Sequence, residues 1–504
     1  MEENQEPLLR RNNKSKLYFH GCPGCQLDQR LEAKPGIPYL EFFYVWIITL
    51  CTALPISSLY PFLYFMIRDL NIAKQEEDIG FYAGFVGASM MLGRALTSVL
   101  WGVLADRYGR KPAIVLSIIS VIIFNTLFGL STSFWMAIVT RFLLGCFNGI
   151  LGIMKAYSSE VCRPEHQALG ISLVSSGWGI GLVIGPAIGG YFSQPAKAFP
   201  DIFSEDSLFG RFPYFLPCLL ISLFAVGVCI ACIWIPETLH KHDERKLKNV
   251  GFECLEASSN CSDSDQKQEE LEGIHPTSEK SLLKNWPLMS SIIIFCVFSL
   301  YDMAFSEIFP LWAESDRKLG GLSYSSQEVG QVLTISGVGL VVYQLTLYPL
   351  FERVLGAILL ARIGAVLTIP LMVAFPFMGL ISGFLLKLIL NCASLLRNIL
   401  SVSIMTGLFI FQNNVVSQCQ RGAASGLAVA LQSVFRAIAP ACAGIVLSWA
   451  QKNQDSLFLP GEHVTFLCLN VTIFIGFIMT FKPFLPPPSE GYTGASDFDW
   501  KVSM

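Results

Sequence analysis

Twelve apolar stretches, each about as long as the hydrocarbon core of a bilayer is thick, dominate this chain. Windows of about 19 residues place them at roughly 41–67, 80–105, 112–131, 134–156, 168–192, 212–235, 286–312, 326–350, 355–378, 386–411, 424–449 and 463–482. A helix can cross lipid because it satisfies its backbone polar groups internally. The sequence therefore predicts an all-α polytopic membrane protein.

The composition agrees with a membrane protein and excludes several other classes. Hydrophobic residues make up 53% and charged residues 14% of the 504 residues, whereas charged residues make up about 25% of a typical soluble domain. The mean hydropathy is +0.52. The net charge of −3 gives no basis for a nucleic-acid partner. The N-terminus is polar and the first apolar stretch is too long for a signal h-region, so no cleavable secretory signal is expected.

A polar segment divides the twelve spans into two groups of six. It covers residues 236–285, is rich in Ser, Glu, Lys and Asp, and cannot bury a core, so we expect a largely disordered linker. The expected organisation is an N-terminal tail (1–40), a six-helix bundle (41–235), the linker, a second six-helix bundle (286–482) and a C-terminal tail (483–504). Lys and Arg gather in the N-terminal tail and the linker, which predicts that both tails and the linker are cytoplasmic.

The two halves resemble each other weakly at two places. Residues 105–110 follow the second span, and residues 351–356 follow the eighth with a similar pattern. Pro186 lies in the fifth span and Pro440 in the eleventh, each among small residues. Two matches at corresponding positions indicate a duplication. Parallel six-helix halves would place a substrate site between them near the midplane, opened alternately to each side.

The loop after the second span is a dense charged turn. It reads Gly-Val-Leu-Ala-Asp-Arg-Tyr-Gly-Arg-Lys-Pro over residues 102–112. The glycines allow a sharp turn, and the basic residues hold it in the cytoplasm. The aspartate is expected to cap a helix or to pair with an arginine in a bond that breaks when the helices move. The residues with an expected gating role are Gly102, Asp106, Arg107, Gly109, Arg110 and Lys111.

Glycines recur every four positions in the fifth span, at Gly177, Gly181, Gly185 and Gly189. They line one helix face, where another helix can approach closely, and Pro186 adds a bend. Two interpretations stay open. The face is either a static packing surface or one that seals or slides during transport, and in the second case all five residues take part in gating.

Seven charged residues lie five or more positions from the ends of the expected spans, and a charge costs roughly 3 kcal/mol or more at mid-bilayer. They are Arg94, Arg141, Asp302, Glu307, Arg362, Arg397 and Arg436. One interpretation pairs them as internal salt bridges. Glu307 is expected near the exit of its span, at the membrane interface.

The excess of arginines over carboxylates supports a second interpretation, a net positive cavity that suits a substrate bearing carboxylates. Arg141, Arg397 and Arg436 would bind those carboxylates. Asp302 would carry the proton. Substrate and proton would then compete for one arginine network, which couples their fluxes.

A Cys-x-x-Cys pair, Cys22 and Cys25, supplies two thiolates at zinc-ligand spacing in the N-terminal tail. His240 and His242 in the linker would complete four ligands, since both segments are expected on the same face of the membrane. The hypothesis is a regulatory zinc site, and the alternative is a solvated tail without metal.

These motifs resemble those of a known family across nearly the whole chain. Residues 102–112 resemble the loop motif of the major facilitator superfamily, residues 141–145 its span 4 arginine motif, and residues 177–190 the span 5 motif of its proton-coupled antiporters. Cys-Pro-Gly-Cys at 22–25, with Pro-Glu-Thr-Leu-His-Lys-His at 236–242, resembles the plant zinc-induced facilitator-like branch. The second half departs from the family's loop motif, so the gating roles are carried over to the first half alone.

The resemblance implies two pseudo-symmetric six-helix bundles and a secondary transporter. It implies antiport of protons against a metal chelator such as nicotianamine or a phytosiderophore, and so a role in zinc and iron homeostasis. The proton gradient is the expected energy source, and no cofactor is expected. The alternative is a proton-coupled exporter of drugs, organic acids or potassium, and a non-transporting nutrient receptor also stays open.

Two further expectations concern chemistry and location. The chain contains no His-Glu-x-x-His and no Gly-x-Ser-x-Gly motif, so an enzyme is not expected. Pro7-Leu8-Leu9 after Glu6 loosely resembles a vacuolar sorting signal, which favours the vacuolar membrane over the plasma membrane.

Overall fold

The computed structural model describes residues 22–33, 36–163, 166–239, 284–416, 421–454 and 461–486, and every regular element in these ranges is helical. The first bundle contains α2 (Tyr39–Ser57), α3 (Leu63–Asp69), α4 (Ile79–Tyr108), α5 (Arg110–Gly129), α6 (Phe134–Phe147), α7 (Ile150–Glu160), α8 (Gln167–Phe192) and α11 (Phe215–Ala231). The second bundle contains α13 (Trp286–Glu314), α14 (Ser326–Thr346), α15 (Tyr348–Leu355), α16 (Ala357–Phe377), α17 (Gly383–Asn414), α18 (Arg421–Lys452) and α19 (Gly461–Met479).

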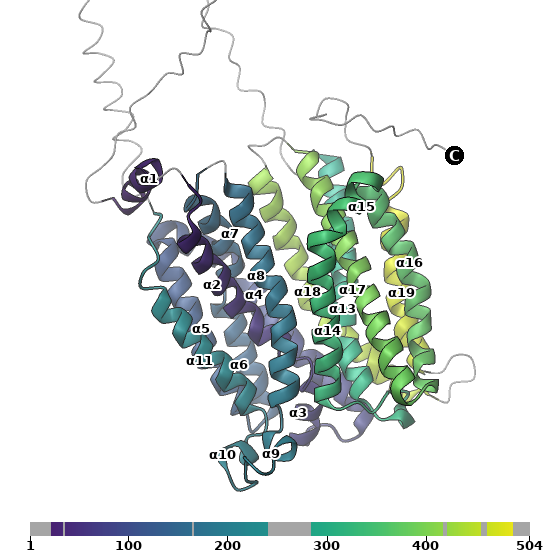
Figure 1. The fold of residues 1–504 in the computed structure, drawn as a ribbon. Helices are drawn as coiled ribbons and strands as arrows, with labels where there is room; N and C mark the ends of the chain where they lie inside the picture. The colour runs from purple at the N-terminus through teal and green to yellow at the C-terminus, as the bar shows by residue number, and fades with distance from the viewer. Residues whose placement is uncertain are drawn as a thin grey trace, which may run out of the picture.

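The two bundles lie side by side and have two distinct ends (Figure 1). One end carries α15 and a short helix before the first bundle, α1 (Pro23–Ala33), and is called the linker side. The other end carries α3 and the short helices α9 (Pro195–Ala198) and α10 (Leu208–Arg211), and is called the far side.

The twelve expected spans all have helical counterparts in the described residues, two of them modified. Ten helical segments of the described residues, one of them α6 and α7 together, are long and apolar enough to cross a membrane. The helices α14 and α15 together would form an eleventh span, bent by 51°, and Pro349 lies in the first turn after the bend. The remaining helix, α11, is apolar but has 17 residues.

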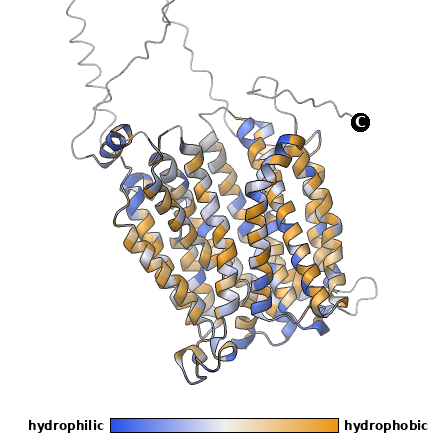
Figure 2. Ribbon diagram, in the orientation of Figure 1, coloured by the Kyte–Doolittle hydropathy of each residue, from blue (hydrophilic) through white to orange (hydrophobic). Residues whose placement is uncertain are grey.

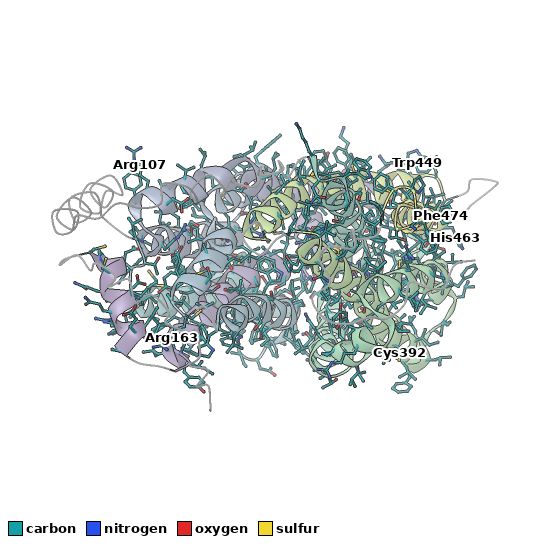
Figure 3. The ribbon with its side chains drawn as sticks, turned by 90° about the horizontal axis from the view of Figure 1, so that it is seen from above. Arg107, Arg163, Cys392, Trp449, His463 and Phe474 are labelled. Carbon is teal, nitrogen blue, oxygen red and sulfur yellow. The ribbon has the colours of Figure 1, made fainter. Side chains whose placement is uncertain are left out.

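The outer surface fits a lipid environment. Hydrophobic residues cover both bundles between two more polar ends (Figure 2). In the second bundle Trp449 and Phe474 lie at the outer edge (Figure 3), where about half of each side chain is exposed. Large exposed apolar side chains of this kind are expected where lipid takes the place of water.

The helix breaks have local causes. At the break between α6 and α7, a Cβ atom on Gly149 would lie 2.2 Å from the ring of Trp101. The indole Nε1 of Trp101 donates to the carbonyl of Cys146 at 2.7 Å, so the ring fills the break and satisfies a freed acceptor. Between α4 and α5, Gly109 turns the chain with a φ of 115°, which favours glycine.

The N-terminal tail contains a helix that the sequence analysis did not anticipate. Arg163, from the loop after α7, holds α1 by donating to the carbonyls of Leu31 at 2.8 Å and Glu32 at 3.1 Å. The backbone N–H of Gly24 donates to the carbonyl of Leu239 at 3.2 Å. The helix is therefore attached to the first bundle by its two ends. Most of the expected linker lies outside the described residues.

The bundles meet through α4 against α18 and α8 against α14. Small residues allow this close approach on the far side. A Cβ on Gly84 would lie 2.4 Å from the carbonyl oxygen of Pro440, and one on Gly190 would lie 2.9 Å from Cα of Gly330. Main chain therefore lies against main chain where the far side closes.

The glycines that recur every four positions in α8, called the glycine ladder, face a different partner. Cβ atoms on Gly181 and Gly185 would lie 2.4 Å from Cβ of Ala53 and 1.9 Å from Oγ of Ser57, and both partners belong to α2 of the same bundle. Gly177 and Gly189 likewise approach the α2 segment, and Pro186 instead faces Gly330 of α14. In this conformation the ladder packs one bundle internally, and a neighbouring face of α8 makes the contact between bundles.

Candidate functional site

Charged side chains from both bundles surround Tyr60, which lies in the turn between α2 and α3. Four charged groups are within electrostatic reach of its hydroxyl: Arg141 of α6, Asp302 and Glu307 of α13, and Arg436 of α18. The site therefore lies between the bundles, where the duplicated halves were expected to place it.

Arg141 is held inside the first bundle. Its side chain is buried, its Nη1 donates to the carbonyl of Pro55 at 2.8 Å, and its guanidinium lies 4.3 Å from the ring centroid of Phe128. The Nε atom has no hydrogen-bond partner among the described residues. Arg141 thus satisfies a carbonyl next to the helix break and keeps one donor unused.

Arg397 and Asp302 form an internal ion pair in the second bundle. Nη2 of Arg397 lies 3.0 Å from Oδ1 of Asp302, and the hydroxyl of Ser401 donates to the same oxygen at 2.7 Å. The guanidinium also stacks 4.1 Å from the ring centroid of Phe305. Asp302 keeps 28% of its side chain exposed against 4% for Arg397, so the carboxylate is the accessible member.

A cationic cluster occupies the linker side of the site. Arg94 of α4 and Lys155 of α7 are both within electrostatic reach of Arg436. Buried nitrogens of Arg94 and Arg436 have no hydrogen-bond partner among the described residues, and Arg94 lies over the ring of Trp178 at 5.8 Å. The sequence analysis named the two arginines but missed Lys155, which lies near the end of an expected span. Arg94 and Lys155 thus both add positive charge around Arg436, and groups of this kind are able to bind an anion.

Glu307 was expected near the exit of its span, at the membrane interface, but it is not exposed there. The residue is buried, with 1% of its surface exposed, and it lines a cavity of about 10 Å³ between the bundles together with Tyr60, Gly87 and Arg141. Counting residues along α13 gave its depth, but its burial depends on the α4 helix packed against it. The position of a charge along one helix does not reveal which neighbour covers it.

Arg362 has a structural role at the linker side. Its Nε donates to Oγ1 of Thr480 at 3.3 Å, its Nη2 donates to the Thr480 carbonyl at 2.5 Å, and its guanidinium lies 4.4 Å from the ring centroid of Phe481. These contacts join α16 to the end of α19. Arg362 is therefore engaged away from the groups around Tyr60.

The charged loop forms a bonded network on the linker side. Arg110 pairs with Asp106 at 2.7 Å and with Glu160 at 3.0 Å. The carboxylate of Glu237 accepts from the backbone N–H groups of Arg110 at 2.9 Å and Lys111 at 3.1 Å, and so caps the start of α5. The aspartate therefore pairs with an arginine, and the cap comes from Glu237.

Two expected gating residues of this loop lie outside the network. Gly102 lies inside α4 with open space around it, so the prediction that it forms the turn is wrong. Arg107 is exposed and lies over the ring of Tyr108, and it appears at the edge of the first bundle in Figure 3. The turn itself depends on Gly109.

The corresponding loop of the second bundle lacks this network. Gly356 repeats the positive φ of Gly109 at 76°. Among the described residues, however, no carboxylate accepts from the first N–H groups of α16. The two loops share a backbone turn but not the bonds around it.

The proposed zinc ligands are only partly within the described residues. Cys22 and Cys25 are buried at the start of α1. His240 and His242 lie outside the described residues, immediately after Leu239, which contacts α1. The part of the chain that the structure describes contains no group of three or more metal-ligating side chains.

Comparison with known sequences assigns the family. The family model of the Major Facilitator Superfamily matches residues 45–440. The chain belongs to this superfamily. Its transporters move small molecules across membranes, so the chain is a secondary transporter and not an enzyme.

Curated relatives narrow the assignment to the zinc-induced facilitators. The chain is 56% identical over 485 residues to Protein ZINC INDUCED FACILITATOR 1 of Arabidopsis thaliana, covering 96% of this chain and 99% of the relative. It is 54% identical to ZINC INDUCED FACILITATOR-LIKE 1 of the same plant, covering 96% of this chain and 98% of the relative. This chain thus belongs to the zinc-induced facilitator family.

Solved structures agree on the fold. A D-xylose–proton symporter superposes with a TM-score of 0.64 at 13% identity, covering 89% of this chain and 98% of that chain. A human organic anion transporter superposes with a TM-score of 0.57 at 14% identity, covering 88% of this chain and 100% of that chain. These likenesses show the major facilitator fold.

Proposed function

We propose that this major facilitator is a proton antiporter that exports a small metal chelator bearing several carboxylates, of the nicotianamine or phytosiderophore type. The proposed location is the vacuolar membrane. The observation that carries the proposal is the cationic cluster of Arg94, Lys155 and Arg436, which has unused donors between the bundles. Carboxylates are the groups that guanidinium donors bind most strongly.

The accessibility of the bundle faces supports entry of the substrate from the linker side. On the far side, Pro186 and Gly190 of α8 lie against α14. Gly179, two turns before Pro186 on the same face, has nothing within 4 Å of an added Cβ, and on α18 Gly426 is equally open. The positive-inside prediction makes this open side the cytoplasm.

The polar contacts between bundles support the same direction. Ser193 and Ser326 share a hydrogen bond of 2.8 Å, Gln331 donates to Tyr191 at 2.9 Å, and Lys452 pairs with Asp78. All these contacts lie on the far side. Among pairs of described residues, no hydrogen bond or ion pair joins the bundles on the linker side.

Proton coupling is proposed to operate through Asp302 and Arg397. While Asp302 is ionised, it occupies the Nη2 donor of the Arg397 guanidinium. Protonation of Asp302 would free that donor for a substrate carboxylate, and binding of the carboxylate would favour the neutral acid. Arg141 and Arg436 complete the set of guanidinium groups available for binding.

Transport into proteoliposomes tests the function. With a proton gradient imposed, wild-type protein is expected to take up labelled nicotianamine, and we would measure uptake with and without zinc or iron. Arg436→Gln is expected to lower uptake at least about tenfold, because it removes a charged hydrogen bond worth about 1.5–3 kcal/mol. The matched control is Lys197→Gln, since Lys197 is a cation in the far-side segment α9.

Three outcomes would redirect the proposal. Uptake of organic acids, drugs or potassium instead of the chelator would select the alternative exporter. Binding of nicotianamine without net flux would indicate a receptor. Equal loss of uptake in Arg436→Gln and Lys197→Gln would show that the cationic cluster has no specific role.

A further inference from the structure

Glu307 is a buried carboxyl that the proposed binding site does not use. It lies on α13, five residues after Asp302, and its Oε2 atom has no hydrogen-bond partner among the described residues. The cavity beside it, about 10 Å³, has room for at most about one water molecule. The carboxyl is therefore covered by protein and is not hydrated as an ion requires.

A glycine of the opposite bundle makes room for this carboxyl. A Cβ atom on Gly87 of α4 would lie 2.6 Å from Oε1 and 2.9 Å from Cδ of Glu307. The carboxyl thus lies directly against the α4 backbone, across the boundary between bundles. This space beside Gly87, called the seat of Glu307, exists only while α4 and α13 are in contact, that is, while the far side is closed.

Few charged or titratable groups face Glu307. From α6 it faces Arg141, and from the turn between α2 and α3 it faces Tyr60. On its own helix the nearest acid, Asp302, is bonded to Arg397. The remaining lining residues, from α2, the turn after it, α4 and α13, are Ile56, Leu59, Val86, Met90, Met91 and Met303.

No ion pair stabilises a charge on Glu307. In the described residues Arg141 is within electrostatic reach of Glu307 but makes no ion pair with it, and its Nη1 donates to the carbonyl of Pro55. A carboxylate buried with an unpaired oxygen and without hydration is strongly disfavoured, whereas the neutral acid is tolerated. The closed far side therefore accommodates the protonated form.

We propose that Glu307 is a second proton-binding residue of this transporter and that the far side closes only when its carboxyl is neutral. This rests on the proposed proton antiport and adds a residue and a direction to it. When the far side opens, Gly87 leaves, water reaches the carboxylate, and it takes one proton from that side. After closure the same O–H bond breaks and the proton passes to water on the linker side, which completes the transfer of one proton. The ionised carboxyl that remains is disfavoured in the closed state, so the far side opens again.

The far side offers a route for the proton. Glu314 lies seven residues after Glu307, two turns along the same face of α13. Both of its carboxyl oxygens lack a hydrogen-bond partner among the described residues, and it lines a far-side cavity of about 390 Å³ with Arg68 and Glu76. A proton entering that cavity meets Glu314 before Glu307.

Hydrogen–deuterium exchange of the full protein in lipid nanodiscs, without substrate, tests the proposal. After correction for intrinsic rates, far-side peptides covering residues 326–337 and 440–452 of wild type are expected to exchange about tenfold faster at pH 8 than at pH 5.5. Glu307→Gln mimics the neutral acid, so the same far-side peptides of this variant are expected to stay protected from exchange at both pH values. The control Glu205→Gln changes an exposed far-side carboxyl and is expected to behave as wild type.

A second variant protects the test against a folding defect. Gly87→Ala keeps Glu307 but fills its seat, so the far side is expected to exchange fast at both pH values. The proposal would be overturned if the far-side peptides of Glu307→Gln exchanged as fast at pH 8 as those of wild type. Fast exchange of these peptides in Glu307→Gln at both pH values would also overturn it, because an ion pair between Glu307 and Arg141 would then be what closes the far side.

The substrate assay separates this proposal from the function it extends. If nicotianamine is not transported, the exchange measurement still reports whether protonation of Glu307 closes the far side. If Glu307 has no role, chelator uptake in Glu307→Gln stays as dependent on the proton gradient as in wild type.

Discussion

Glu237 shows how one side chain can join two distant segments of the first bundle. Its carboxylate accepts hydrogen bonds from Arg110, Lys111, Thr238 and Leu239, and so ties the exit of α11 to the start of α5. It also explains why Gly109 is needed, because a Cβ there would lie 2.5 Å from Oε2 of Glu237. The sequence analysis assigned this kind of role to Asp106.

Glu237→Ala is expected to release the loop between α4 and α5. It removes the cap of α5, which is worth about 1–2 kcal/mol, so the thermal unfolding temperature should fall and amide exchange at residues 106–112 should rise. The matched control is Glu352→Ala in the corresponding loop of the second bundle. Unchanged exchange at residues 106–112 would contradict the assigned role of Glu237.

At the scale of helices, the structure separates two kinds of glycine contact. Gly181 packs α8 against α2 inside the first bundle, whereas Gly84 packs α4 against α18 between the bundles. Both would place a Cβ within 2.4 Å of a neighbour, but the neighbours differ in what they do during transport. A contact inside a bundle persists, and a contact between bundles breaks and reforms.

Substitution by leucine is expected to distinguish the two positions. Gly181→Leu should lower the unfolding temperature, since overpacking costs about 1–3 kcal/mol. Gly84→Leu should leave that temperature nearly unchanged but expose the far side and slow transport. The measurements are thermal melting and proteoliposome uptake on both variants. A Gly181→Leu protein that melts normally yet fails to transport would instead favour the sliding interpretation of the ladder.

Helices were predictable to the extent that their cause is local. Apolar length marked every span, because lipid imposes the same requirement on each segment separately. The helix α1 was missed because it is polar and is held by Arg163 and Leu239, which are distant in sequence. The cationic cluster was incomplete for a similar reason, since Lys155 and Arg436 come from different bundles.

At the scale of the whole molecule, closure of the far side defines the state that the structure represents. Ser193 of the first bundle and Ser326 of the second are both buried, and their hydroxyls lie 2.8 Å apart. The bundles cannot separate on the far side without breaking this contact. It therefore offers a direct test of whether the far side must open.

A Ser193→Cys, Ser326→Cys double variant is expected to cross-link under oxidation and to lose most of its transport. A protease site inserted in the linker would show the bond, because the two halves would stay joined on a non-reducing gel. Reductant should restore uptake, and each single variant should be unaffected by oxidant. Full transport by the cross-linked protein would mean that the far side need not open at these serines.

The unequal loops of the two halves have a mechanical consequence. The first bundle binds its loop to α11 through Glu237 and to α7 through Glu160, whereas no such cap is present at α16 in the described part of the second bundle. The loop is thus held by side-chain contacts in the first half but not by a corresponding cap in the second. We therefore expect the first half to stay rigid during transport while the second half rearranges. Introducing the same loop contacts into the second half should slow transport rather than improve it.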